Sequence, residues 1–111
     1  MVWKWEWFFN ASKSQLQIEE LKISVFLLHQ ATENFYNAIE LVFAAYKSRT
    51  HNIKKLNKKV AVYHPDLSTI FPVDTQEQKE CFKLLKEAYI RARYDKHYKI
   101  TKEQLLYFFP R

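Results

Sequence analysis

The sequence of 111 residues contains no glycine. Average usage of about 7% would give about eight glycines in a chain of this length. The glycine-rich loops that wrap phosphates in P-loop and Rossmann proteins are therefore excluded, and tight hairpins of the Asn-Gly type are excluded with them. Because helices need glycine less than sheets do, this absence favours an all-α protein.

Cysteine is nearly absent as well. The single Cys81 cannot form an internal disulfide, and its place in the apolar pattern of a helical segment predicts a buried structural thiol. The four histidines, His29, His51, His64 and His97, are scattered along the chain and have no paired cysteines beside them. We therefore expect no zinc or other metal site and no cofactor.

Long apolar runs are also missing. No stretch approaches the roughly 20 residues that span a bilayer, and the aromatic N-terminus lacks the basic and leucine-rich parts of a signal peptide. Apolar residues make up 48% of the chain and charged residues 27%, which excludes a disordered tail. We expect one cytoplasmic domain over residues 1–111, because a chain of this size builds a single hydrophobic core.

Acidic residues are absent from residues 41–65, which hold six cations. This number equals the net charge of +6 for the whole chain. A patch of this kind attracts phosphate groups and other anions, although a lysine-rich helix face that serves only solubility has the same pattern. The six are Lys47, Arg49, Lys54, Lys55, Lys58 and Lys59.

The spacing of apolar residues predicts helices along most of the chain. The strongest pattern covers residues 20–46, and a first helix is expected from about Trp5. Asn52 can cap a third helix, which His64 and Pro65 should end. These segments belong to an antiparallel up-and-down four-helix bundle with a short fifth C-terminal helix.

Two capping-box patterns place the starts of the last two helices. Asp74 and Glu77 come before the fourth segment, and Thr101 and Gln104 come before the short fifth one. At the other end of the chain, large aromatic residues are too numerous for one edge of a small bundle, which indicates an interface with a second copy or another domain. They are Trp3, Trp5, Trp7, Phe8 and Phe9.

Three stretches in order resemble the HEPN domain family: LLHQATE in the second helix, the basic turn KSRTHN, and AYIRARYDKHYKITKEQL near the C-terminus. The likeness covers nearly the whole chain. Its nearest subgroup is the one that accompanies nucleotidyltransferases and includes the sacsin-like HEPN domains. The resemblance implies a helical domain that dimerises, partners a nucleotidyltransferase and presents a polar groove built from the second and fourth helices.

On this resemblance, the chain is expected to bind nucleotide or nucleic-acid phosphate without catalysis of its own and without a membrane partner. The site residues are then the cations Arg91, Arg93 and Lys96, which would contact phosphate, and His29, Glu33 and His51, which would shape the pocket. His29 and Glu33 lie four apart on one helix face. They form either the floor of a pocket that faces Arg93 or a hydrogen-bonded polar layer inside the bundle.

The ribonuclease branch of the family offers an alternative, a metal-independent toxin in which an Arg and a His act on the scissile phosphate. Arg91 and His97 have five residues between them, which fits that pattern, but Ala92 stands where Asn, Asp or His is expected. Arg93 leaves only three residues before His97. A histidine can transfer protons near neutral pH and an arginine can stabilise an oxyanion. A third possibility is a structural dimerisation module whose functional surface is the aromatic N-terminus.

Overall fold

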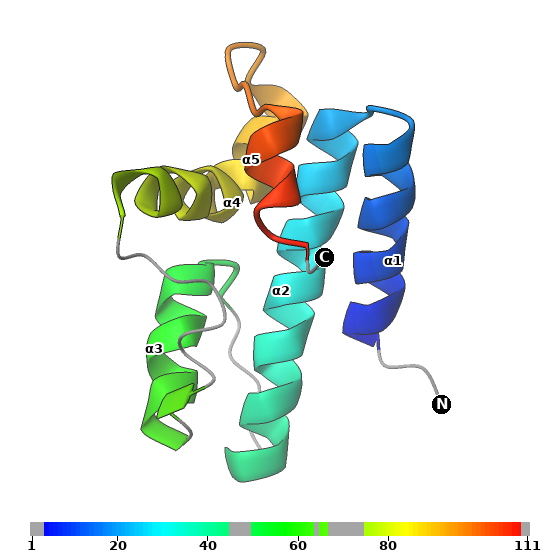
Figure 1. Ribbon diagram of the computed structural model, residues 1–111. Coiled ribbons are helices and arrows are strands. Elements are labelled where there is room, and N and C mark those ends of the chain that lie inside the picture. Colours follow the sequence, from blue (N-terminus) through cyan, green and yellow to red (C-terminus); the bar gives the residue numbers. More distant parts are fainter. Residues whose placement is uncertain (1–3, 45–49, 64, 67–74, 110–111) are drawn as a thin grey trace.

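The computed structural model describes residues 4–44, 50–63, 65–66 and 75–109, and within them every regular element is helical (Figure 1). The long helix α2 is central, and the other helices pack against it. The predicted all-α helical bundle is therefore confirmed. The helices are α1 (Lys4–Gln17), α2 (Leu21–Ala44), α3 (Ile53–Tyr63), α4 (Gln76–Tyr94) and α5 (Lys102–Leu106).

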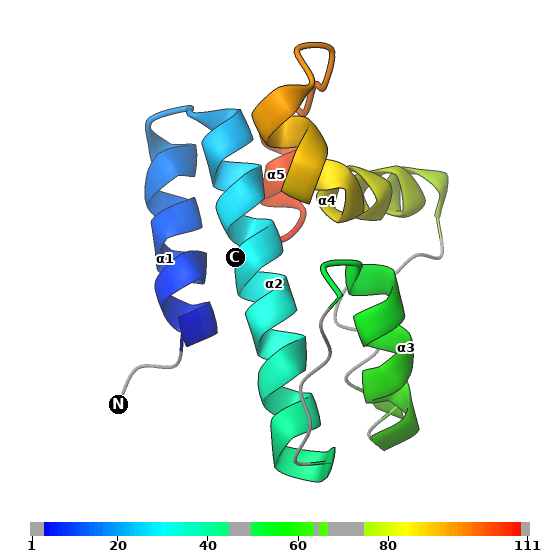
Figure 2. The ribbon, with the colours of Figure 1, turned by 180° about the vertical axis from the view of Figure 1, so that it is seen from behind.

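Helix α1 runs antiparallel to α2, as Figures 1 and 2 show from opposite sides. Helix α3 instead runs parallel to α2. His51, just before α3, is bonded to Glu33, whereas Tyr63 at the end of α3 stacks on Phe43 near the end of α2. The up-and-down order is thus not kept at this helix.

The length of the connection before α3 allows this direction. The eight residues 45–52 can span about 26 Å when extended. Ala44 lies about 16 Å from Glu33 along α2, at 1.5 Å per residue. The chain can therefore return to the middle of α2 before α3 begins. Helix α4 then runs crosswise to α2, on the side of α2 that faces away from α1, in both views (Figures 1 and 2).

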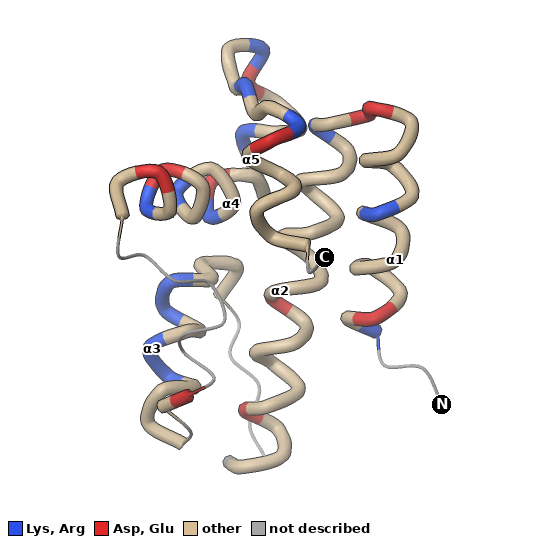
Figure 3. The backbone as a smooth tube through the Cα atoms, in the orientation of Figure 1, with Lys and Arg blue, Asp and Glu red and all other residues tan. Residues whose placement is uncertain are grey.

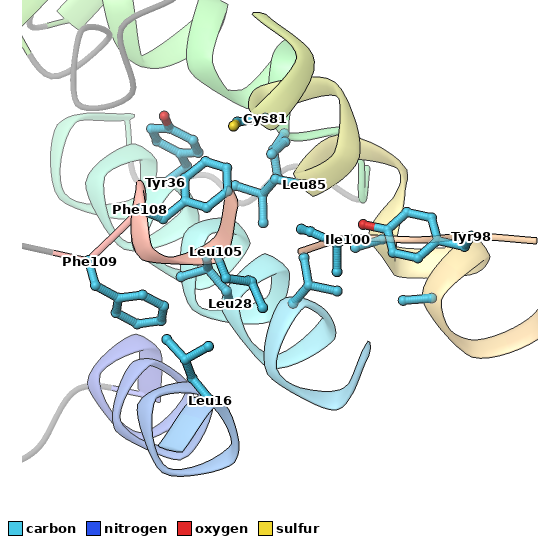
Figure 4. Close-up of a cluster of buried hydrophobic side chains, with 14 of the residues drawn as sticks. Leu16, Leu28, Tyr36, Cys81, Leu85, Tyr98, Ile100, Leu105, Phe108 and Phe109 are labelled. Carbon is cyan, nitrogen blue, oxygen red and sulfur yellow. The ribbon is translucent and has the colours of Figure 1, made fainter. Parts of the chain in front are cut away.

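The hydrophobic core lies between α2, α4, α5 and the start of α3 (Figure 4). Leu28 of α2, Leu85 of α4 and Leu105 of α5 are completely or almost completely buried. Phe109, in the turn after α5, reaches Phe9 of α1, with ring centroids 5.2 Å apart. The segment after α5 therefore joins the first helix to the rest of the core.

Cys81 is buried on α4 (Figure 4), as predicted. Burial raises the pKa of its thiol, and the nearby carboxylates of Glu77 and Glu80 raise it further. A thiol of this kind is a poor nucleophile because the thiolate is the reactive form. The position is structural.

The helix starts follow local hydrogen-bond chemistry. The capping box predicted at Thr101 is confirmed. The one before α4 forms one residue later than the predicted pair of Asp74 and Glu77, because Thr75 has the extended backbone of an N-cap and its partner is Gln78. Asp74 itself lies outside the described residues.

Helix α3 begins and ends near the predicted positions. The side-chain oxygen of Asn52 accepts hydrogen bonds from the backbone N–H groups of Lys54 and Lys55. The helix ends at Tyr63, directly before the His64-Pro65 pair, of which His64 lies outside the described residues. The residue before a proline is driven away from helical angles, which explains this end.

The turn between α1 and α2 shows what the lack of glycine costs. Glu19 has φ 61°, in the left-handed region that favours glycine. Its N–H donates to the Leu16 carbonyl, and the N–H of Glu20 donates to the Gln15 carbonyl. This pattern closes the end of α1 with a non-glycine residue in the strained position.

The aromatic residues of α1 divide between the core and the surface. Trp5 contacts Phe35 edge-to-face with ring centroids 5.2 Å apart, while Trp7 is 62% exposed. Trp3 lies outside the described residues. Within the described part of the chain, no helix has both the length and the apolar character that crossing a membrane requires.

Candidate phosphate-binding site

Tyr89 of α4 is the centre of a cluster formed by α2, α4 and the segment before α3. The ring of His51 stacks on the ring of Tyr89, with centroids 4.0 Å apart and an interplanar angle of 13°. The ring of His29 lies 5.6 Å from it, and the guanidinium carbon of Arg93 lies 4.6 Å from its centroid. Three of the predicted site residues, His29, His51 and Arg93, thus meet at Tyr89, which is not among the predicted site residues.

His29 is fully buried beneath this cluster. Burial lowers its pKa to about 4, and the positive charges of His51 and Arg93 act in the same direction. The neutral ring donates from Nε2 to the His51 carbonyl at 3.0 Å, so Nδ1 accepts from the Gln30 amide at 3.3 Å. The Glu33 carboxylate, 3.7 Å from Nδ1, therefore forms no ion pair with His29 at neutral pH.

Glu33 is instead paired with His51. Its Oε1 lies 2.8 Å from His51 Nδ1, and a carboxylate can only accept, so Nδ1–H donates. This bond fixes the orientation of the imidazole and occupies Nδ1, so Nε2 is the ring nitrogen that remains for a ligand. The His51 side chain is 50% exposed, whereas that of Glu33 is 11% exposed. A buried carboxylate therefore positions a histidine that solvent can reach.

Arg93 lies on the same side of α4 but is held by aromatic rings. Its Nε donates to the Tyr89 carbonyl at 2.7 Å, and its guanidinium also lies 4.9 Å from the ring centroids of Phe26 and Tyr94. These contacts direct the cation toward α2, close enough to lower the pKa of His29. Arg93 and His29 thus lie beside the same ring, that of Tyr89.

Arg91 is bound to two carboxylates on its own helix. Nη1 donates to Glu87 and Nε donates to Asp95, four residues before and after it. Both carboxylates raise the pKa of the guanidinium. The two ion pairs fix the plane of the Arg91 guanidinium. Within the described residues Nη2 makes no hydrogen bond, so its N–H groups are available to a ligand.

An open cavity of about 380 Å³ lies between α4 and the start of α3. Two lysine or arginine side chains and His51 line it, together with one carboxylate, that of Glu87. The lining residues are His51, Asn52, Lys86, Glu87, Tyr89, Ile90 and Arg91.

A second cavity, of about 630 Å³, lies between the starts of α4 and α5 and is lined by Glu77, Glu80 and Glu103 with no lysine or arginine. Those carboxylates disfavour an anion there. Of these two cavities, only the first has the charge that phosphate requires.

Lys96 and His97 lie in the turn after α4, where both are exposed, and neither lines the cavity. Helix α4 ends at Tyr94, so helical spacing does not relate Arg91 or Arg93 to His97. Asp95 links the two ends of the predicted ribonuclease pair. It accepts from Arg91 through one oxygen and from the backbone N–H of His97 through the other.

The basic segment lies beside the cavity on α3. Ile53, Leu56 and Val60 are fully buried, whereas the lysines of this helix are exposed. Figure 3 marks their positions along the helix. They are Lys54, Lys55, Lys58 and Lys59. Lys47 and Arg49 lie outside the described residues.

Sequence reasoning missed three residues that define the cavity: Lys86, Glu87 and Tyr89. A weak signal was present, because Lys86 and Ile90 are four apart and Glu87 and Arg91 are four apart, which aligns each pair on one helix face. Spacing could not show which of those faces meets the start of α3.

The family model for the HEPN domain matches residues 4–108 of the chain. No curated protein matches it.

Proposed function

The chain belongs to the HEPN domain family, and from this premise we propose that it binds nucleotide or nucleic-acid phosphate in the cavity between α3 and α4. In this proposal the domain partners a nucleotidyltransferase, functions as a homodimer and has no catalytic activity of its own. The observation that carries the proposal is the convergence of Lys86, Arg91 and His51 on one open cavity.

The residues have different roles in this proposal. The available Nη2 group of Arg91 and the ammonium of Lys86 bind phosphate oxygens directly, since charge-assisted hydrogen bonds are the stronger class. His51 contributes Nε2, and Glu33 positions it from beneath. His29 shapes the site by holding the His51 carbonyl. Arg93 and Lys96 lie outside the cavity lining and contribute positive potential at longer range.

Binding of nucleoside mono-, di- and triphosphates and of single-stranded RNA, measured by calorimetry at low salt, tests the proposal. Lys86→Gln should weaken binding about tenfold, because a hydrogen bond to a charged group contributes about 1.5–3 kcal/mol. Lys22→Gln removes the same charge from an exposed position on α2 and should leave affinity unchanged. Absence of binding by the parent protein, or equal weakening by both variants, would contradict the proposal.

The ribonuclease reading has one observation in its favour, namely that Asp95 brings Arg91 and the backbone of His97 to a single carboxylate. Incubation with RNA in EDTA separates it from simple binding. If the parent cleaves RNA and His97→Ala does not, the enzyme reading is correct. Intact RNA in both samples leaves the binding proposal.

The homodimer rests on the exposed Trp7 at the edge of α1. A large exposed aromatic side chain is typical of an interface. Size exclusion with light scattering should report a dimer for the parent and a monomer for Trp7→Ala. If Trp7→Ala is still a dimer, the interface lies elsewhere. If the parent protein is a monomer, both the proposed homodimer and the alternative function as a structural dimerisation module are wrong.

A further inference from the structure

Two large apolar side chains are exposed at the edge of the proposed phosphate cavity. Ile90 is 61% exposed and lines the cavity, and Tyr94, one helical turn further along α4, is 74% exposed. Single exposed apolar residues are common on protein surfaces. This pair differs from them because it continues directly from a cationic cavity.

Tyr94 is also supported from one side. The guanidinium of Arg93 lies 4.9 Å from the Tyr94 ring centroid and is itself held by the Tyr89 carbonyl and the Phe26 ring. The aromatic ring is thus positioned by a fixed cation and still presents most of its surface to solvent. A nucleobase can stack on such a ring, because every base has a π-face and arginine adds a cation–π contribution.

We infer that Tyr94, with Ile90, forms a nucleobase subsite for one nucleotide of a single-stranded RNA whose phosphate occupies the adjacent cavity. This inference rests on the function proposed above and extends it from phosphate binding to base stacking. Tyr94 lies about 6 Å from Ile90 along α4, at 1.5 Å per residue, so a base can reach the ring from the cavity mouth.

The lysine face of α3 indicates an oligonucleotide rather than a free mononucleotide. Asn52, which caps α3, lines the cavity, and Lys54, Lys55 and Lys58 are exposed along the helix that begins there. Phosphates beyond the first would find positive charge on this face. A duplex does not fit the same surface, because its bases are stacked internally and cannot lie on a tyrosine ring.

The decisive probe is an abasic strand. Fluorescence anisotropy would compare a short single-stranded oligoribonucleotide with a strand of equal length and charge that lacks bases. The parent protein should bind the normal strand roughly tenfold more tightly, within the range known for base–aromatic stacking. Tyr94→Ala should remove this preference without changing affinity for the abasic strand, and Tyr94→Phe should keep it.

Ile18→Ala is the control, because it truncates a large apolar side chain of similar exposure in the turn after α1, which lies on the other side of α2 from α4 (Figure 1). Circular dichroism would establish that each variant is folded. Equal affinity for the two strands, or a preference that survives Tyr94→Ala, would overturn the base subsite while leaving the phosphate proposal intact. Binding of neither strand would overturn the phosphate proposal itself.

A third arm uses free nucleoside monophosphates. If these bind as tightly as the oligonucleotide and depend equally on Tyr94, the assignment to a single strand is wrong. The expected result is weaker binding of the monophosphate. The salt dependence should also be steeper for the strand, because more phosphates release counterions on binding.

Discussion

Helix α2 buries polar side chains on two sides, and the two sides use them differently. Against α1, the hydroxyl of Ser12 donates to the Ser24 carbonyl at 2.7 Å and the hydroxyl of Ser24 donates to the Ser12 carbonyl at 2.9 Å. Both side chains are completely buried. Against α3 and α4, the pair of His29 and Glu33 ends at His51, which is half exposed and lines a cavity.

The difference lies in where the hydrogen bonds end. The serine pair is closed, since each donor is used on the opposite helix, and small side chains allow α1 and α2 to approach closely. The histidine cluster is open at one end, because Glu33 satisfies only Nδ1 of His51. A buried polar network whose last side chain is exposed can position that side chain for a ligand. A network whose side chains are all buried and paired can only hold two helices together.

The largest expected effect is at His29. His29→Ala should lower the free energy of unfolding by about 2–4 kcal/mol, because it leaves a cavity and an unpaired His51 carbonyl. Chemical denaturation at neutral pH would measure this. His29→Gln keeps an N–H donor and should lose much less. A similar loss for both variants would mean that packing, and not the hydrogen bond, makes His29 important.

The pH dependence of stability should also originate at this cluster. Burial lowers the pKa of His29 from its ordinary value of 6.5 to about 4 in the folded protein. Between these values the unfolded chain binds a proton that the folded protein does not, so stability falls as the pH drops from about 6.5 to about 4 and is full above 6.5. The loss between pH 7 and pH 4.5 should be about 2–3 kcal/mol greater for the parent than for His29→Gln.

The closed pair should respond more weakly. Ser12→Ala should cost about 1 kcal/mol, a typical net value for one buried hydrogen bond, since the Ser24 carbonyl belongs to a helix and keeps its backbone partner. The double variant Ser12→Ala with Ser24→Ala should cost less than the sum of the single ones, because the 3.2 Å contact between the two hydroxyls is lost in either single variant and is therefore counted twice in their sum. A double-mutant cycle from thermal or urea unfolding would test this. Additive losses would show that the two hydroxyls act independently.

The smallest expected effect is a gain in stability at the turn between these two helices. Glu19→Gly should raise the free energy of unfolding by about 0.5 kcal/mol. The substitution relieves a left-handed conformation that costs about 1–2 kcal/mol, but part of this gain is lost because glycine gives the unfolded chain more conformational entropy. Glu19→Ala keeps the strain and is the control. A loss of stability in Glu19→Gly would show that the exposed contact of Glu19 with Lys102 matters more than the backbone angle.

Local chemistry made most of the helices predictable. The apolar spacing of α2, the Asn52 cap and the Thr101 capping box act over three or four residues, and each is found in the structure. The capping box of α4 was misplaced by one residue because Thr75 and Asp74 are both good caps and their third neighbours both suit the motif. Only the backbone angle at Thr75 separates them.

The direction of α3 and the composition of the cavity were not predictable in the same way. The connection of eight residues before α3 fits either direction. Once α3 runs parallel to α2, His51 meets Glu33 and Tyr89, which lie 18 residues before it and 38 after it. No local pattern encodes contacts over such separations.

The amino-acid sequence was enough to predict the helical class, the bounds of most helices and the likeness to HEPN domains, because periodicity, capping and motif order can be found along the chain without the fold. The tertiary structure alone decided which cations share a cavity. It placed Arg91 and Lys86 beside His51 and left Lys96 and His97 outside, since that choice depends on how α4 crosses α2 and where α3 starts. Packing of the buried helix faces fixes the crossing of α4 and the start of α3, and the positions of these two helices then determine where their polar side chains lie.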